Sequence, residues 1–443
     1  MKYTKFLLLL ILTASCASQR TVRHQYHQAD MRPAEPVEVQ QPVVVVEEEE
    51  VLEPEVVASA RPLVSQVNRF PEGTWQYDKQ QALDLLCQSP IFETTQLGLY
   101  VYDLTDGQPL YAINAAQRMR PASCQKVVTA VTALNYLKGD FQLRTEFRIS
   151  GKVRAGVLEG DLIVVGGMDP LVTTDELVEA ATTIKQKQGF SSIKGNLVFD
   201  LSMREDKELG WGWCWDDDYG PLSALFVDGK DYFEQKWFLA LDAAGISLSS
   251  STQGLKGQAD RQSKTVYSIR HNLDYLLEPM MKNSDNIYAE CLFYQTAATT
   301  GKKWAGRKEV AQRTEELLKK IGLDTNQYKV ADGSGLSLYN YVSAEMLVAL
   351  LGYAWRTQDI KEHLLPSLPI AGFDGTLKNR MVGTEADGNV RAKTGTVTGV
   401  SSLAGYLTAA NGHTLAFAII NQGVSSASTG RAFQDKVCIE LCR

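Results

Sequence analysis

Three short polar motifs, far apart in the chain but in a fixed order, constrain its fold more than any other feature. They are Ser123-Cys-Gln-Lys126, Ser284-Asp-Asn286 and Lys393-Thr-Gly-Thr396. If they act together, residues separated by more than half of the chain must meet in one cleft. The sequence therefore predicts a fold in which two helix starts and one strand converge.

The first motif opens an apolar helix predicted over 123–137, and Pro121 suits the start of a helix. Residues three apart lie on one face of a helix, so Ser123 and Lys126 can touch. A neutral lysine amine can take the proton of a serine hydroxyl, and burial or nearby positive charge lowers the pKa of a lysine. A lone Ser-x-x-Lys more often marks an ordinary capped helix. A second match at 191–194 runs into a glycine and a strand-like segment, and we interpret it as coincidental.

The other two motifs supply the remaining functions of such a site. Ser284 can relay a proton and Asn286 can bind a substrate amide, although Ser, Asp and Asn also favour an ordinary N-cap. A strand edge at 393–396 can align an extended peptide, and Gly395 permits close backbone approach. Lys393 can hold a terminal carboxylate together with the hydroxyls of Thr394 and Thr396, although a basic turn is the simpler interpretation. Each motif alone favours the simpler interpretation, whereas all three in this order favour a catalytic site.

This ordered triple is the signature of class A β-lactamases and penicillin-binding proteins. Over about 75–440 the sequence resembles the class C low-molecular-mass penicillin-binding proteins, the D-alanyl-D-alanine carboxypeptidases/endopeptidases of the DacB type (peptidase family S13). Besides the first and third motifs, the matching runs are Gly160-Asp-Leu162, Gly166-Gly-Met-Asp-Pro170, Trp213-Cys-Trp-Asp-Asp217 with Tyr219, Pro221-Leu-Ser-Ala-Leu225, Asn283-Ser-Asp-Asn-Ile-Tyr-Ala-Glu290 around the second motif, and Asp332-Gly-Ser-Gly-Leu-Ser337. Cys124 departs from the family, which often has Asn after the nucleophile.

The resemblance implies a mixed α/β (α+β) fold. Its main part is a penicillin-binding transpeptidase/β-lactamase-like domain, an antiparallel sheet flanked by helices with a helical subdomain, which we assign to 72–140 and 266–443. One smaller α/β domain is inserted at 141–265, and the second insert of the family is largely missing. The helices predicted from pattern include 174–189, the one helix of the insert, and 271–281 and 284–299. Closing strands are predicted at 402–407 and 414–421.

The resemblance also implies a mechanism. A serine peptidase would form an acyl-enzyme on peptidoglycan stem peptides, and β-lactams would acylate the same serine. The catalytic residues implied are Ser123, Lys126, Ser284, Asn286 and Lys393, and the substrate-binding residues are Thr394, Gly395, Thr396 and Asp169. Backbone N–H groups of Ser123 and Thr396 would form the oxyanion hole. Asp169 would meet the amine of a diaminopimelate side chain, although it is equally a turn residue before Pro170. The chemistry requires no cofactor and no metal.

Two other functions remain open from the sequence. A β-lactamase would use the same fold with fast deacylation, but no convincing copy of the class A water-activating loop is present, because Glu315-Glu316 belongs to an amphipathic helix. A non-catalytic cell-wall-binding paralogue would not need all five catalytic residues. A Ser-His-Asp hydrolase fits poorly, since no Gly-x-Ser-x-Gly elbow occurs.

The N-terminus predicts export. Two lysines in residues 1–5 precede an apolar run and the small residues before Cys16, which is the layout of a secretory signal. Residues 1–16 resemble a lipoprotein signal in which Cys16 is lipidated, although Thr13 replaces the preferred aliphatic residue. Residues 17–71 are rich in Pro, Val and Glu, and predict a disordered acidic linker. We therefore expect a periplasmic protein attached to a membrane only through Cys16.

The net charge and the remaining cysteines bear on the possible partners and on the disulfide bonds. A net charge of −7 does not suggest a nucleic-acid partner. Six cysteines besides Cys16 allow fifteen disulfide pairings, among which the sequence cannot choose.

Overall fold

The computed structural model describes residues 63–214, 217 and 220–443. The predicted signal segment, Cys16 and most of the predicted linker lie outside these residues. Residues 63–71, which we assigned to the linker, run beside strand β2 (Gln108–Ile113), where the Gln66 N–H donates to the Ala112 carbonyl at 2.7 Å. The described fold therefore includes residues 63–71, which we had assigned to the linker. No helix among the described residues is long and apolar enough to cross a bilayer.

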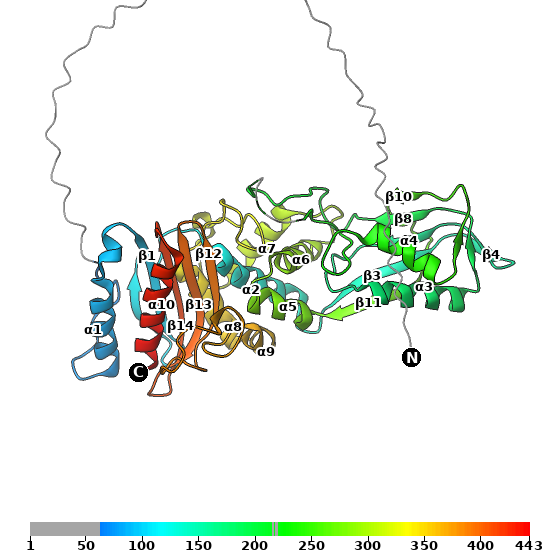
Figure 1. Ribbon diagram of the computed structural model, residues 1–443. Helices are drawn as coiled ribbons and strands as arrows, with labels where there is room; N and C mark the ends of the chain where they lie inside the picture. The colour runs from blue at the N-terminus through cyan, green and yellow to red at the C-terminus, as the bar shows by residue number, and fades with distance from the viewer. Residues whose placement is uncertain (1–62, 215–216, 218–219) are drawn as a thin grey trace, which may run out of the picture. The chain divides into compact units, whose positions relative to one another are not determined.

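One antiparallel sheet joins the two ends of the described chain (Figure 1). Its order is β12-β13-β14-β1-β2, so the N-terminal hairpin pairs with the C-terminal strands along the β1–β14 seam. The other strand bounds are β1 (Gln96–Asp103), β12 (Arg391–Val397), β13 (Val400–Thr408) and β14 (Thr414–Gln422). Strand β12 forms one edge of this sheet. Pro369 and Ile370 pair with the start of this strand at Arg391 and Ala392, and the part beyond them, which holds the third motif, can accept an extended peptide.

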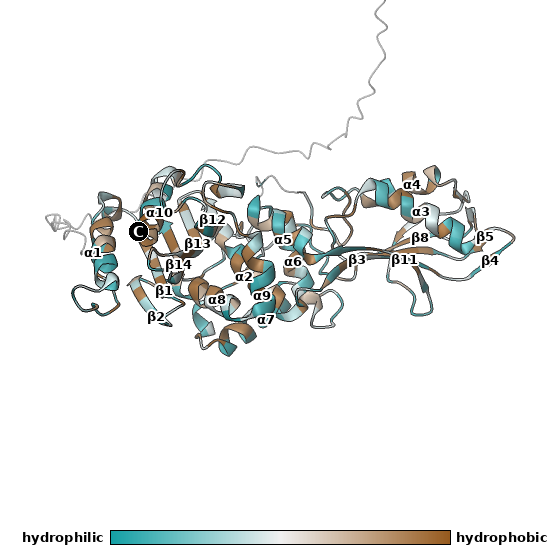
Figure 2. Ribbon diagram, turned by 90° about the horizontal axis from the view of Figure 1, so that it is seen from below, coloured by the Kyte–Doolittle hydropathy of each residue, from teal (hydrophilic) through white to brown (hydrophobic). Residues whose placement is uncertain are grey.

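Helices cover both faces of this sheet. On one face α10 (Ala427–Cys442) packs against β13 and against α1 (Trp75–Cys87). On the other, α8 (Ala344–Arg356) packs against β14 and leads into a helical region built around α2 (Gln125–Leu137). The other helices of this region are α5 (Leu273–Lys282), α6 (Asn286–Ala298), α7 (Arg307–Lys320) and α9 (Gln358–Ser367). Figure 2 shows apolar and polar sides on α5 and α8, as expected for helices that bury one side.

Helix α2 is the central element of the helical region. Its residues from Gln125 to Leu134 are all buried, because α6, α7, α8 and α9 surround it. The valines and alanines of the first motif's helix are thus the core of the domain, which fixes the motif at a rigid position.

The chain between β3 (Gln142–Ile149) and β11 (Lys264–Asn272) builds two further sheets. One has the order β10-β8-β6-β3-β11, and the other has the order β4-β5-β7-β9. A separate apolar core forms under α3 (Thr174–Gln188) and α4 (Phe233–Ala243). The strands are β4 (Lys152–Arg154), β5 (Val157–Glu159), β6 (Leu162–Val165), β7 (Ser192–Ile193), β8 (Leu197–Asp200), β9 (Ser247–Leu248) and β10 (Gly254–Lys256).

The structure confirms the predicted mixed α/β fold and corrects two details. The inserted segment contains α4 as well as the predicted helix 174–189, so the expectation of one helix there was wrong. The predicted helix 271–281 is a strand up to Asn272 and a helix only from Leu273, because β11 pairs with β3 through Asn272. This junction joins the inserted sheet directly to the helical region.

Candidate active site

Ser123 lies in a tight 3₁₀ turn (Ala122–Cys124) directly before α2. Ala122 has φ +47°, a conformation that non-glycine residues rarely adopt and that often occurs at functional sites. Lys126, the second residue of α2, is fully buried, and its Nζ lies 3.0 Å from the Ser123 Oγ. The structure thus brings serine and lysine into hydrogen-bonding distance.

The Lys126 amine has two further partners from distant segments. Its Nζ donates to Asn286 Oδ1 at 2.5 Å and to the Ser334 carbonyl at 2.8 Å. Burial lowers the pKa of Lys126 to about 8, although the carboxylates of Asp332 and Glu290 oppose this effect. An amine with this pKa is partly neutral near pH 7, as a general base must be.

The second motif occupies the start of α6. Asp285 caps the helix, since its carboxylate accepts from the Tyr288 N–H at 3.1 Å. This cap places Asn286 at the first helical position, against Lys126. Ser284 precedes the cap with φ +62°, and its Oγ accepts from Lys393 Nζ at 2.9 Å. The motif therefore contacts both lysines.

The third motif forms part of edge strand β12 and packs against the Ser123 turn. A Cβ at Gly395 would lie 2.7 Å from the Pro121 carbonyl and 3.0 Å from the Cys124 nitrogen, so only glycine permits this approach. Lys393 is fully buried, and burial together with the nearby Lys126 charge lowers its pKa to about 7.

A cavity of about 510 Å³ unites the three motifs. Among the described residues that line it, none is acidic, and three are basic. The residues that line the cavity are Ser123, Ser284, Gly375, Thr376, Lys378, Asn379, Arg380, Thr394, Thr396 and Arg431, of which Lys378, Arg380 and Arg431 are the basic ones. The cavity therefore presents the serine to an anionic ligand.

The structure places Asp169 elsewhere. Its side chain is fully buried, and its carboxylate lies 2.7 Å from His271 Nδ1 and accepts from the Leu171 N–H at 3.0 Å. In this conformation the carboxylate faces an imidazole and is not presented to a substrate amine.

Sequence reasoning missed three residues of the site. Glu290 and Asp332 are buried beside Lys126, and Arg431 reaches the cavity from α10. Glu290 follows Asn286 by four positions on α6, which was a usable signal because such residues share a helix face. Arg431 gave no local signal, since only the packing of α10 across the sheet brings it there.

The six described cysteines are all free thiols. Cys124 is fully buried beside Ser123, and its Sγ donates to the Lys393 carbonyl at 3.2 Å. Burial raises its pKa, so this thiol is not a competing nucleophile.

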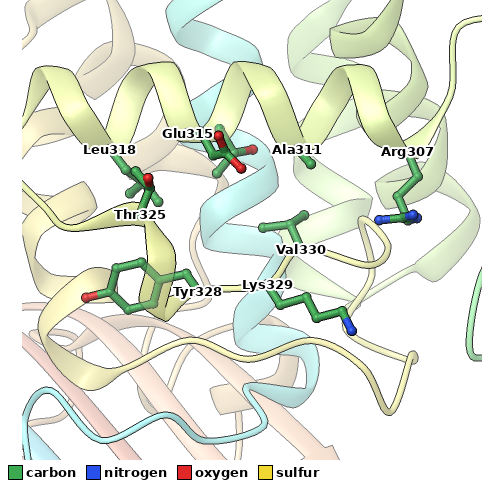
Figure 3. A pocket seen from close by; sticks show the side chains of 9 residues that line it. Arg307, Ala311, Glu315, Leu318, Thr325, Tyr328, Lys329 and Val330 are labelled. Carbon is green, nitrogen blue, oxygen red and sulfur yellow. The ribbon is translucent and has the colours of Figure 1, made fainter.

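A second pocket, of about 180 Å³, lies between α7 and residues 325–330 (Figure 3). Glu315 lines this pocket and does not line the cavity that contains Ser123. Glu316 accepts from Arg313 at 2.9 Å. Neither carboxylate is placed to activate water at Ser123.

The fold and the site together define a serine acyl-transfer enzyme of the penicillin-binding type. A serine within hydrogen-bonding distance of a buried lysine, a Ser-x-Asn motif and a Lys-Thr-Gly edge strand surround one cationic cavity. The D-Ala-D-Ala carboxypeptidase 3 (S13) family model matches residues 79–230 and 221–439, and the chain belongs to this family. The resemblance inferred from the sequence is thereby confirmed.

Curated relatives carry the same description. The D-alanyl-D-alanine carboxypeptidase DacB of Haemophilus influenzae is 29% identical over 422 residues, which cover 76% of this chain and 87% of the relative. The D-alanyl-D-alanine carboxypeptidase of an Actinomadura species is 29% identical, with 82% and 84% covered. Carboxypeptidase DacB of Mycolicibacterium smegmatis is 30% identical, with 78% and 80% covered.

Solved structures agree with the fold. Penicillin binding protein 4 (dacB) from Haemophilus influenzae has a TM-score of 0.71 and 26% identity, covering 83% of this chain and 98% of that one. The same protein was solved in complex with a β-lactam, at a TM-score of 0.67 and 27% identity. A predatory endopeptidase from Bdellovibrio bacteriovorus, 18% identical, shares the fold with a TM-score of 0.52.

Proposed function

We propose that this enzyme is a serine-type D-Ala-D-Ala carboxypeptidase/endopeptidase of peptidoglycan stem peptides, with Ser123 as its nucleophile. The observation that carries the assignment is the Lys126 Nζ, buried and 3.0 Å from the Ser123 Oγ inside the motif-lined cavity. Family membership supplies the substrate class.

The reaction has two steps. Neutral Lys126 takes the proton of Ser123, and the Oγ forms an ester with the carbonyl carbon of the penultimate D-alanine. The C–N bond to the last residue breaks, and its nitrogen receives a proton through Ser284. Water then cleaves the ester. Backbone N–H groups of Ser123 and Thr396 stabilise the oxyanion in both steps, a contribution of about 3 kcal/mol per donor in comparable enzymes.

Two motif residues orient the substrate. Asn286 binds the amide of the acyl chain, and edge strand β12 pairs with the peptide backbone. In a cross-linked substrate the same step cuts the bridge between two stem peptides. β-Lactams enter as substrate mimics and leave a stable ester on Ser123.

Intact mass spectrometry after benzylpenicillin treatment tests this assignment. The wild type should gain the mass of one penicilloyl group, mapped to the peptide that contains Ser123, and Ser123→Ala should gain none. Ser191→Ala, in the coincidental Ser-x-x-Lys match, is the control and should be labelled normally. An adduct on another side chain would overturn the assignment, and an adduct that disappears within seconds would instead indicate a β-lactamase.

We also propose that the protein is exported to the periplasm and anchored through Cys16. The support is the order of lysines, apolar run and small residues before this cysteine. Cys16→Ala should move the protein from the membrane fraction to the soluble fraction and remove the lipid mass. An unchanged fractionation would contradict the anchor.

A further inference from the structure

We propose that Arg431 of α10 supplies the fixed positive charge that binds the substrate's terminal carboxylate. This inference deepens the proposed function and rests on it. It reassigns to the C-terminal helix a role that the sequence gives to Lys393.

The position of Lys393 is poorly suited to that role. Its side chain is fully buried, and its Nζ donates to Ser284 Oγ at 2.9 Å and to the Thr394 carbonyl at 2.7 Å. Lys393 does not line the cavity. Because burial lowers its pKa to about 7, its amine is partly neutral at neutral pH.

Three basic residues do line the cavity, and their contacts differ. Arg380 is bound to Asp435 of α10, at 2.9 Å from Nε and 2.6 Å from Nη2. Lys378 is exposed on the segment before β12. Arg431 is exposed too, but its Nη2 donates to Thr396 Oγ1 at 3.4 Å, so its guanidinium lies on a residue of the third motif.

The hydrogen bonds of the two hydroxyls in the third motif also favour a carboxylate site beside Arg431. Thr394 Oγ1 donates to Thr376 Oγ1 at 2.8 Å, which directs its proton away from a ligand. Thr396 Oγ1 accepts from Arg431, so its own proton can go to an anion. An arginine fork beside a hydroxyl donor matches the geometry of a carboxylate, and an arginine stays charged at every working pH.

The test compares two substrates, a diacyl peptide that ends in D-Ala-D-Ala with a free carboxylate and the same peptide as its C-terminal amide. The wild type should prefer the acid. Arg431→Gln should lower kcat/KM for the acid by about tenfold to a hundredfold and leave that for the amide within about twofold. Arg431→Lys should recover part of the loss, since it restores the charge without the fork. Lys436→Gln, an exposed cation of α10 that lines a different groove, should change neither value.

Three results would overturn the inference. They are equal losses on both substrates in Arg431→Gln, an unchanged preference for the acid in that variant, or a wild type that does not distinguish acid from amide. Penicillin labelling distinguishes a wrong role for Arg431 from a wrong assignment of the enzyme itself. If the wild type forms no adduct on Ser123 and cleaves neither peptide, the enzyme assignment itself fails.

Discussion

Lys126 and Lys393 lie in the same site, and both amines are buried away from water. Burial lowers the pKa of both, and the charge of Lys126 lowers the pKa of Lys393 further. Since the proposed base acts only when neutral, the rate should rise with pH through the titration of Lys126.

We expect the second-order rate constant for acylation by benzylpenicillin to rise about tenfold per pH unit on the acid side and to level off above about pH 8. The measurement is stopped-flow or gel-based labelling between pH 5.5 and about 9.5. Ser191→Ala should reproduce the wild-type profile. A rate constant that is flat or falls over this range would contradict Lys126 as the base.

Glu290 acts on Lys126 through the backbone. Its carboxyl accepts from the Gly333 N–H at 3.0 Å and the Ser334 N–H at 2.8 Å, and the Ser334 carbonyl accepts from Lys126 Nζ. Burial raises the pKa of Glu290 to about 8. We interpret it as a positioning residue that holds this turn.

Glu290→Gln replaces one acceptor oxygen by an NH₂ group, which faces backbone N–H donors. We expect a loss of about 1–3 kcal/mol in unfolding free energy, because the Oε1 atom can still accept from both N–H groups but the new NH₂ group is a buried donor that faces the Gly333 N–H. The acylation rate should fall about tenfold or more and its pH midpoint should shift, which a purely structural role would not produce. Glu316→Gln on α7 is the control. An unaltered pH midpoint would show that the turn does not control Lys126.

At the scale of elements, edge strand β12 reaches the Ser123 turn only because Gly395 has no side chain. Gly395→Ala should push the strand away, since its Cβ would meet Ser402 Oγ, Pro121 O and Cys124 N. We expect acylation to fall about a hundredfold, and unfolding free energy to fall by about 1–3 kcal/mol. Penicillin labelling and thermal unfolding measure the two effects.

Gly254→Ala in β10 is the matched control, because its Cβ would meet only side-chain carbons at 3.4 Å or more. It should leave acylation unchanged. If Gly395→Ala also leaves the labelling rate unchanged, close packing of β12 on the turn is not required for the chemistry.

Local signals predicted some elements and missed others. The helix predicted over 174–189 matches α3, which has a Thr173–Glu176 capping box and ends at Gly189 in the left-handed conformation. Helix α4 was missed because Tyr232 stands at its N-cap and gives no side-chain hydrogen bond there. Sequence patterns predict a helix well when capping residues mark where it begins and ends.

The residues of the site also differ in whether the sequence carries a signal for them. Serine, lysine and asparagine were predictable because their spacing on helices and their order along the chain carry the chemistry. Glu290 had such a signal, since it follows Asn286 by four positions on α6. Asp332 and Arg431 contribute through burial and long-range packing, which sequence spacing does not express. The same limit explains Asp169, whose carboxylate is bound to His271 across the junction with the inserted segment.

At the scale of the whole molecule, the inserted segment and the helical region meet at β11, where His271 contacts the carboxylates of Asp169 and Glu176. His271 is the residue before the last of β11, with Nδ1 at 2.7 Å from Asp169 and Nε2 at 3.0 Å from Glu176 of α3. The hydrogen bond to Asp169 and the two carboxylate charges raise the pKa of His271 above its usual 6.5, although burial opposes this. Its stabilising contribution is therefore complete below about pH 6.5 and is lost as pH rises through the raised pKa.

We expect His271→Gln to lower the melting temperature more at pH 6 than at pH 8.5, so that the variant depends less on pH than the wild type over this range. His413→Gln is the matched control, because the pKa of His413 is also raised, by Asp103, but this residue lies in the turn before β14. Hydrogen exchange of β11 and α3 should increase in the first variant and not in the second. Since the inserted segment meets the helical region through β11 and α5, an equal pH dependence in wild type and His271→Gln would mean that apolar packing alone holds this junction.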